Sequence, residues 1–362
     1  MSEGKRRPKP KRVIPIPSKP GKGPPIEEYA RLAAEHFALN KVSARFAPKI
    51  IGHERAKRAL ILTLLSVNDW GGSRGRIHCL LTGPPGSGKT TLIETAARIS
   101  EIEVLSSRLS PGSLTVDFRK DVEENQGAFG QAHRLDGSGV FAIDEFEKVP
   151  PESLKHFLRA MESGVIAVPG NDDIVVIPTH WRLIAAANSQ DNLIPELVSR
   201  FDFKVNVPLP TKGQAESVID GISQTFMQGV GEHAMPEADL GSRIDQSDAI
   251  PEEAWLRGFI SWAREFTPQF SPEERRHSAR VLKQVLHAED EGHLQLRGYE
   301  AVYRIAFALA RLRRRDVSVE IVMDAVEILR SERNWGPRFE RQRELLTLLR
   351  KDRTTKSRVV AQ

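Results

Sequence analysis

The stretch Gly83-Pro-Pro-Gly-Ser-Gly-Lys-Thr90 determines how the rest of this 362-residue sequence is interpreted. It fits the pattern G-x-x-x-x-G-K-[ST], follows the apolar run Ile77–Leu81 and leads into a helical pattern over Thr91–Ile99. Glycines at these places let the backbone fold around phosphate oxygens, and the N-terminus of the following helix adds positive charge. The stretch therefore predicts a strand, a phosphate-binding loop (P-loop) and a helix.

The P-loop supplies the candidate nucleotide-binding residues. Lys89 would neutralise the β- and γ-phosphates of a nucleotide, and the hydroxyl group of Thr90 would bind Mg²⁺. We therefore expect ATP and Mg²⁺ as cofactors. The candidate binding residues are Gly83, Pro84, Pro85, Gly86, Ser87, Gly88, Lys89, Thr90 and Thr91.

Two adjacent carboxylates end the run Val140-Phe-Ala-Ile-Asp144-Glu145, about 55 residues after Lys89. An apolar strand that ends in two carboxylates places both at the edge of the sheet where the P-loop emerges. Asp144 would hold the Mg²⁺ shell, and Glu145 would orient or deprotonate the attacking water. The pair is therefore the predicted second half of the nucleotide site.

Two polar residues farther along the chain complete the candidate catalytic set. Leu183-Ile-Ala-Ala-Ala-Asn188 is typical of a buried strand that ends in an amide, and this amide can hydrogen-bond the attacking water or a γ-phosphate oxygen. Charge that develops on the γ-phosphoryl group needs a further cation, for which Arg200, delivered by a neighbouring subunit, is the candidate. An ion pair of Arg200 with Asp202 or Glu196 is the alternative interpretation.

The pattern of apolar residues predicts an α/β fold. Short strand-like runs alternate with helical segments as far as Val207, which predicts a parallel, doubly wound sheet. The runs are Ile77–Leu81, Ile102–Leu105, Val140–Ile143, Leu183–Ala187 and Phe203–Val207. Helical patterns also occur at Ile26–Leu39 and at residues 54–68. After Pro208 only helical patterns continue, which predicts a small all-helical lid of Glu252–Glu265, Pro272–His287, Leu296–Arg313 and Ser318–Ser331.

The expected organisation follows from these patterns and from local composition. Residues 1–25 are rich in Lys, Arg, Pro and Gly and cannot bury enough apolar surface to fold. They either touch nucleic-acid phosphates or only keep the chain in solution. The predicted parts are a disordered basic arm (1–25), a linker helix (26–50), the α/β core (51–210), a linker (211–250), the helical lid (251–332) and a basic C-terminal tail (333–362).

Composition limits the class of protein. The formal net charge of +5 and the sequence pI of about 9.3 are compatible with a nucleic-acid partner. A single cysteine, Cys79, permits neither an intrachain disulfide nor a cysteine-based zinc cluster. The most apolar stretch, Ala59–Val67, is far shorter than the roughly 20 residues that span a bilayer, and no signal sequence is recognisable. We therefore expect no membrane partner and a cytoplasmic protein, associated with the nucleoid if it binds DNA.

Together these motifs resemble the ATPase core of the MCM-type replicative helicases, a branch of the AAA+ ATPases. The resemblance covers about residues 45–332. In the first lobe it rests on Ile51-Gly-His53 with Lys57, Ile77–Leu81, the P-loop, Gly139–Lys148, Arg159–Gly164, Ala185–Asn188 and Ser199–Asp202. In the second lobe it rests on Leu256–Arg264 and Arg297–Arg304.

The resemblance implies an AAA+ core that forms a ring of identical subunits, expected to be a hexamer around DNA, with a loading or accessory protein as a further partner. Arg297 matches the family's sensor-2 arginine, which reaches the nucleotide of the adjacent subunit. Residues 164–178 are typical of a β-hairpin around a Pro-Gly-Asn-Asp turn and match the family's pore hairpin. Residues 111–133 correspond to its second pore element.

The sequence also departs from the family's pattern. Its P-loop is closer to general AAA+ usage, and its hairpin tip is Asn171-Asp172-Asp173 where the family usually carries a lysine. Two carboxylates repel a DNA backbone, although Arg119, Lys120 or Arg134 could compensate. The family's N-terminal DNA-binding, zinc-bearing region and its C-terminal winged helix have no recognisable counterpart. We therefore expect a motor core with basic tails.

Three functions follow from these features. The first is a ring ATPase that moves along DNA or unwinds it, and the second is a protein-remodelling AAA+ ATPase of the chelatase or MoxR type, which needs no basic pore. The third is an ATP-binding MCM relative that regulates a partner. A relative that has lost hydrolysis is disfavoured because the candidate site residues are intact, namely Lys89, Asp144, Glu145, Asn188 and Arg200.

Overall fold

The computed structural model describes most of the segments that the sequence predicts to be folded. It covers residues 25–67, 75–100, 104–105, 139–169, 174–179, 181–191, 193–214, 216, 219, 252–287 and 296–332. The predicted basic arm, the C-terminal tail, the segment 111–133 and the tip Asn171-Asp172-Asp173 lie outside the described residues, as do Arg119, Lys120 and Arg134.

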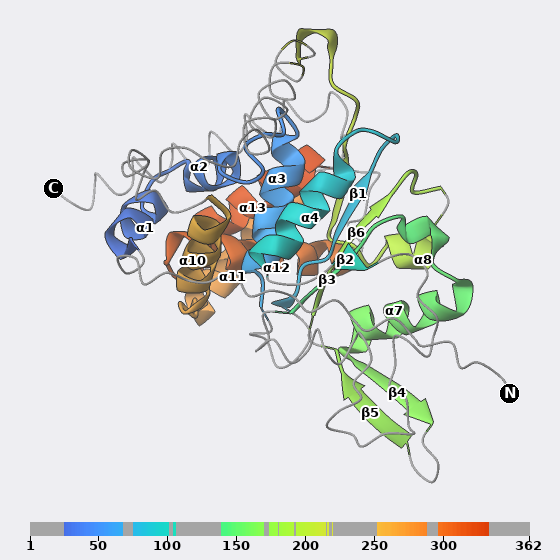
Figure 1. Ribbon diagram of the computed structural model, residues 1–362. Coiled ribbons are helices and arrows are strands. Elements are labelled where there is room, and N and C mark those ends of the chain that lie inside the picture. Colours follow the sequence, from blue (N-terminus) through green and yellow to red (C-terminus); the bar gives the residue numbers. More distant parts are fainter. Residues whose placement is uncertain are drawn as a thin grey trace, which may run out of the picture.

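In the described part of the chain, the central sheet has five parallel strands in the order β2-β3-β6-β1-β7 (Figure 1). They are β1 (Cys79–Thr82), β2 (Val104–Leu105), β3 (Val140–Ile143), β6 (Arg182–Ala187) and β7 (Phe203–Asn206). Each strand overlaps a predicted run, so the prediction of an α/β fold with a parallel sheet is confirmed. Since the strands are parallel, their C-terminal ends meet at one edge, where the P-loop follows β1.

The first strand begins two residues later than the run Ile77–Leu81 predicts. The backbone N–H of Ile77 donates to Ser66 Oγ at 3.0 Å, and that of His78 donates to Asp202 Oδ2 at 3.0 Å. Because side chains accept from these two N–H groups, the pairing of β1 with β6 and β7 starts only at Cys79.

Helices cover both faces of the sheet. Successive strand residues point to opposite faces, so Cys79 and Leu81 belong to one buried cluster and Leu80 to the other. The first cluster includes α3 (Glu54–Leu65) and α4 (Lys89–Ile99). The second includes the short 3-10 helix η2 (Phe146–Lys148), α7 (Pro151–Ser163) and α8 (Pro195–Val198).

The prediction of one continuous helix over Ile26–Leu39 is wrong. The chain forms α1 (Ile26–Ala33) and α2 (Ala38–Ala44), with a turn between them. The turn lets both helices reach the core. The ring of Tyr29 packs edge-on against Trp255, and Val42 of α2 is fully buried. The burial of both helices therefore favours a break in the helix, although the helical pattern of the sequence is continuous.

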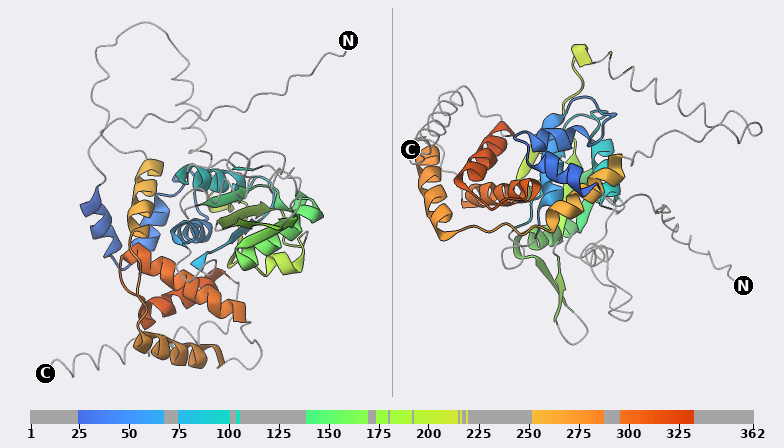
Figure 2. Two further views of the ribbon diagram at one scale, coloured as in Figure 1. Left: turned by 90° about the horizontal axis from the view of Figure 1, so that it is seen from below. Right: turned by 90° about the vertical axis from the view of Figure 1, so that its left-hand side faces the viewer.

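The C-terminal helices follow the predicted segments closely. They are α10 (Glu252–Arg264), α11 (Pro272–His287), α12 (Leu296–Arg313) and α13 (Val319–Glu332). Helix α12 packs against α3, and α10 packs against α4 (Figures 1 and 2). One hydrophobic cluster therefore runs without a break from the sheet into these helices.

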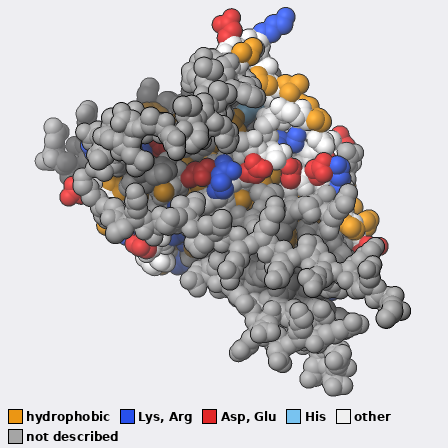
Figure 3. Space-filling view, in the orientation of Figure 1, with side chains coloured by type: hydrophobic (Ala, Val, Ile, Leu, Met, Phe, Trp, Pro, Cys, Tyr) orange, Lys and Arg blue, Asp and Glu red, His pale blue; other side chains and the backbone are white. Residues whose placement is uncertain are grey.

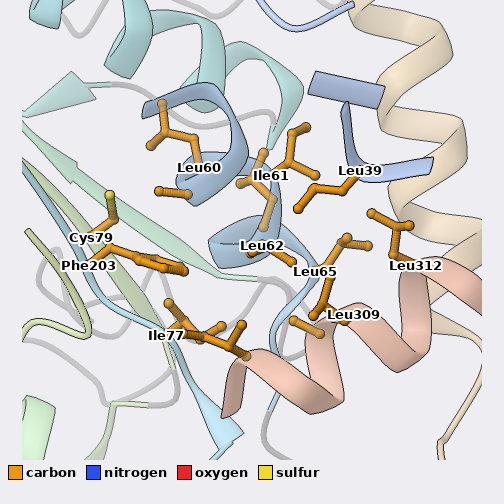
Figure 4. Close-up of a cluster of buried hydrophobic side chains, with 14 of the residues drawn as sticks. Leu39, Leu60, Ile61, Leu62, Leu65, Ile77, Cys79, Phe203, Leu309 and Leu312 are labelled. Atoms are coloured by element: carbon orange, nitrogen blue, oxygen red, sulfur yellow. The ribbon is translucent and has the colours of Figure 1, made fainter. Parts of the chain in front are cut away.

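The close packing is visible where α3 meets α12. Leu65 of α3 lies beside Leu309 and Leu312 of α12, while Ile77 and Phe203 extend the cluster toward the sheet (Figure 4). All five side chains are fully buried. Among the helices in the described part of the chain, none combines the length and apolar character that a bilayer crossing demands.

The predicted β-hairpin is confirmed. Strands β4 (Val165–Pro169) and β5 (Ile174–Pro178) pair antiparallel, with Pro169 opposite Ile174, and project away from the body of the molecule (Figures 1 and 2). At the base, the N–H of Thr179 donates to Gly164 O at 2.7 Å. The guanidinium group of buried Arg76 donates to the carbonyls of Thr179, Trp181 and Ala160. The root of the hairpin is thus tied to the C-terminal end of α7.

Candidate nucleotide-binding site

Three glycines with positive φ shape the P-loop. The φ angles are 152° at Gly83, 77° at Gly86 and 90° at Gly88. A Cβ atom added to Gly83 would lie 2.1 Å from Val207 O, whereas no atom lies within 4 Å of one added to Gly86 or Gly88. The first glycine is therefore required by close packing against the end of β7, and the other two expose backbone toward open space, where phosphate oxygens can approach.

Replacing Gly83 by alanine is expected to lower the free energy of unfolding by roughly 2–5 kcal/mol, because the new methyl group meets a backbone carbonyl at a strained φ. The fall in the midpoint of thermal unfolding measures this effect. Gly213→Ala is the matched control, since an added Cβ there meets no atom within 4 Å, and we expect a change within about 0.5 kcal/mol. Equal midpoints for the two variants would contradict the assignment of Gly83 as a packing residue.

The side chain of Lys89 lies inside the P-loop. Its Nζ donates hydrogen bonds to Gly83 O at 2.7 Å and to Pro84 O at 2.8 Å. Burial lowers the pKa of Lys89 from its ordinary value, while the nearby carboxylates of Asp144 and Glu147 act in the opposite direction. The hydroxyl oxygen of Ser87 is buried and has no hydrogen-bond partner among the described residues. A buried cation beside an unsatisfied hydroxyl suits an oxygen-rich anionic ligand.

The two candidate Mg²⁺ ligands lie together. Thr90 Oγ1 donates to Asp144 Oδ2 at 2.7 Å, and Asp144 Oδ1 accepts from the N–H of Glu145 at 2.8 Å. Mg²⁺ prefers oxygen ligands and is commonly held by one or two carboxylates together with substrate phosphates. The hydroxyl and carboxylate oxygens found here therefore fit a magnesium ion bound to a nucleotide.

Glu145 occupies an unusual backbone conformation beside this pair. Its φ is 51°, in the left-handed region, and its side chain is half exposed. The carboxylate accepts a hydrogen bond from Lys148 Nζ at 2.5 Å. Left-handed backbone at a residue other than glycine is uncommon and clusters at functional sites. The turn places Glu145 directly after β3, at the edge of the sheet where the P-loop emerges.

Asn188 has a partner that sequence reasoning missed. Its amide Nδ2 donates to Glu147 Oε1 at 2.6 Å, and its backbone N–H donates to the same oxygen at 3.2 Å. Both residues lie just beyond the C-terminal ends of neighbouring strands, since β3 pairs with β6. Glu147 is the third carboxylate of Asp144-Glu-Phe-Glu147, a spacing that could have drawn attention to it.

Arg200 forms neither of the two ion pairs considered from the sequence. Its guanidinium group pairs with Glu162 of α7, with an N–O distance of 2.7 Å. Asp202 has other partners, because its Oδ2 accepts from the N–H of His78 and its Oδ1 accepts from Arg304 at 2.7 Å. The loop that carries Arg200 is therefore fastened to both α7 and α12.

Arg297 is the second residue of α12, and its side chain lies outside the described residues. Arg304, two turns farther along the same helix, contacts Asp202 as described. Helix α12 thus carries the candidate sensor-2 residue and also contacts the loop of Arg200.

Comparison with known proteins identifies the family of this chain. Residues 25–208, about half of the chain, match the model of the MCM P-loop domain. The chain belongs to the MCM family. The match begins with α1 and ends directly after β7, so it contains every candidate site residue except Arg297.

Several curated MCM proteins are similar to a longer part of the chain. It is 26% identical over 320 residues to the DNA replication licensing factor MCM7 of Arabidopsis thaliana, an alignment that covers 79% of this chain and 42% of the relative. It is 27% identical over 347 residues to the probable DNA helicase MCM8 of the same plant, with 78% and 42% covered. The DNA replication licensing factor mcm5-A of Xenopus laevis is 26% identical over 343 residues, with 84% and 44% covered. The chain thus spans less than half the length of these MCM relatives.

Proposed function

We propose that this chain is the ATP-hydrolysing core of an MCM-type ring motor that acts on DNA, by moving along it or by unwinding it. The observation that carries the proposal is the hydrogen bond between Thr90 of the P-loop and Asp144 after β3, which brings the two halves of the predicted nucleotide site together. A magnesium ion held by these two residues would neutralise charge on the phosphate oxygens.

Each site residue has a role in this proposal. Lys89 and the P-loop backbone bind the triphosphate, Glu145 orients or deprotonates the attacking water, and Asn188 helps to position that water. Arg200 and Arg297 act on the nucleotide of the neighbouring subunit. The doubly wound sheet is the AAA+ core, and α10–α13 form its lid.

The position of Arg200 supports action on a neighbour. Phe201, the next residue, packs in the buried cluster of α7, whereas the P-loop helix α4 packs in the cluster on the opposite face of the sheet. The guanidinium group is held by Glu162 on α7 of its own chain. A ring of identical subunits, expected to be a hexamer, would bring this side of one subunit to the P-loop of the next.

Two features bear on DNA as the substrate. The β4–β5 hairpin projects from the body of the molecule as a pore element would, and the sequence carries a net charge of +5. Acidic and basic side chains are interspersed on the described surface shown in Figure 3, which offers no broad single-sign patch there. In a ring, we expect the hairpin and the basic termini to make DNA contacts.

A second candidate function, remodelling of a protein substrate, is favoured by one observation. The hairpin tip carries Asp172 and Asp173, and carboxylates weaken contact with a phosphate backbone. A peptide in the pore would meet no such repulsion. This reading predicts an ATPase that DNA does not stimulate.

The response to DNA distinguishes these two functions. ATP turnover of the purified chain is measured at low salt, with and without single- or double-stranded DNA, and we expect DNA to raise it severalfold. If a subunit makes 6–10 phosphate contacts, its affinity for DNA falls by roughly 10³–10⁵ between 50 and 200 mM salt. The Lys89→Ala variant gives the background rate. If DNA changes neither turnover nor oligomeric state, the DNA proposal is wrong and protein remodelling replaces it.

A further inference from the structure

The hydrogen bonds of Glu147 restrict the orientation of Asn188. One carboxylate oxygen, Glu147 Oε1, accepts both from the amide Nδ2 of Asn188 at 2.6 Å and from its backbone N–H at 3.2 Å. An ionised carboxylate can only accept hydrogen bonds, so the NH₂ end of the amide must face it. The carbonyl oxygen Oδ1 of Asn188 is therefore turned away from Glu147 and left as an acceptor.

Packing and a backbone hydrogen bond hold the residues on both sides of Glu147. Its neighbour Phe146 is fully buried and packs edge-on against Phe157 of α7 and against Phe201. Within η2, the N–H of Lys148 donates to Glu145 O at 2.9 Å. The buried ring of Phe146 on one side and the turn on the other restrain the backbone of Glu147, from which the carboxylate reaches the Asn188 amide.

Glu147 lies at the same edge of the sheet as the proposed phosphate site. It follows Asp144, which accepts a hydrogen bond from Thr90 of the P-loop, and its negative charge opposes the lowering of the pKa of Lys89 by burial. Its second oxygen, Oε2, is buried and has no hydrogen-bond partner among the described residues. One carboxylate oxygen of Glu147 thus accepts hydrogen bonds from Asn188, and no described residue donates a hydrogen bond to the other oxygen.

We propose that Glu147 is a positioning residue that holds the Asn188 amide with Oδ1 facing the attacking water. A water that attacks phosphorus must direct a lone pair at it, which requires acceptors for its hydrogens. Glu145 supplies one acceptor, and a fixed Oδ1 of Asn188 supplies another. This role rests on the proposed ATPase function and adds a residue to it.

Substitutions can exchange the donor and the acceptor of the hydrogen bond between residues 147 and 188, and this exchange tests the proposal. In Asn188→Asp two carboxylates face each other, so we expect kcat to fall roughly ten- to hundredfold, with the KM for ATP little changed because binding rests on the P-loop. In the double variant Asn188→Asp/Glu147→Gln, the glutamine NH₂ group can donate to the aspartate. The second oxygen of that aspartate then remains as the acceptor, so we expect kcat to rise about tenfold above that of Asn188→Asp.

Two further variants complete the test. Glu147→Ala removes the reference carboxylate and is expected to lower kcat roughly tenfold, while Glu152→Gln, an exposed glutamate in the first turn of α7, should not change it. Thermal unfolding and binding of a fluorescent ATP analogue show that each variant is folded.

The outcomes separate this role from the proposed function. A wild-type kcat in Glu147→Ala, or a folded double variant no faster than Asn188→Asp, overturns the positioning role while the ATPase proposal stands. If the wild-type chain itself does not hydrolyse ATP, the proposed function fails and this role fails with it.

Discussion

Replacing Arg200 by alanine is expected to lower ATP turnover by roughly 10³–10⁵, because the γ-phosphoryl group loses a cation that the P-loop does not supply. ATP binding should survive, since Lys89 and the P-loop backbone are untouched. Steady-state hydrolysis and binding of a fluorescent ATP analogue measure the two quantities. Arg275→Ala, at an exposed position near the start of α11, is the control and should leave turnover unchanged.

Mixing inactive subunits tests whether Arg200 acts on a neighbour. In the proposed ring, a mixture of Arg200→Ala and Lys89→Ala subunits would form some interfaces that pair an intact P-loop with an intact arginine. These interfaces should recover a part of the turnover that each variant lacks alone. Mixed rings without any recovery would show that Arg200 acts within its own subunit.

The ion pair of Arg200 with Glu162 is compatible with action of Arg200 on the nucleotide of a neighbouring subunit. The glutamate side chain is 58% exposed, and a partly exposed pair is worth only about 0–1 kcal/mol. The pair is therefore sufficient to orient the arginine and weak enough to be exchanged for a phosphate oxygen. Asp202, held by Arg304 and by the backbone of His78, keeps the loop itself in place.

Local patterns predicted the regular elements well. Helix α11 extends from Pro272 to His287 as its sequence indicates, because proline is favoured in the first turn of a helix and an apolar stripe follows it. Although the contact of Gly83 with Val207 is not local, the P-loop was predictable because Gly86 and Gly88 have positive φ angles, which is a local reason for glycine. Such features depend on residues close together in the sequence, which a pattern can describe.

Contacts between distant residues were not predictable in the same way. Asn188 was identified, but its partner Glu147 is 41 residues away and meets it only because β3 pairs with β6. The apolar residues of these strands do not encode which strands are neighbours. Glu162 and Arg200 likewise meet through tertiary packing, and no spacing rule connects them.

Buried arginines show a second limit of sequence patterns. Arg182 begins β6 and is only 1% exposed, although an arginine ordinarily indicates surface. Its guanidinium group donates to the carbonyls of Ser66 and Gly139. These hydrogen bonds connect the end of α3 to the start of β3. The polar group is tolerated because backbone carbonyls surround it, and composition alone does not reveal that environment.

Replacing Glu145 by glutamine is expected to lower ATP hydrolysis by roughly 10²–10⁴ and to leave ATP bound. The amide keeps the volume of the carboxylate but cannot accept a proton from water. The backbone should not change, because the N–H of Glu145 still donates to Asp144 Oδ1, which sustains its left-handed φ. Single-turnover hydrolysis and retention of labelled ATP measure the effect.

The same substitution at Glu152 is the matched control, because this exposed glutamate lies in the first turn of α7 and follows η2 closely. A normal rate in Glu152→Gln beside trapped ATP in Glu145→Gln would assign the loss to one carboxylate rather than to a change of surface charge. Full activity in Glu145→Gln would instead show that the carboxylate does not take a proton from the water. Because the glutamine oxygen still accepts a hydrogen bond, both acceptors assigned to the attacking water would remain, and orientation by residues 145 and 188 would then account for the rate.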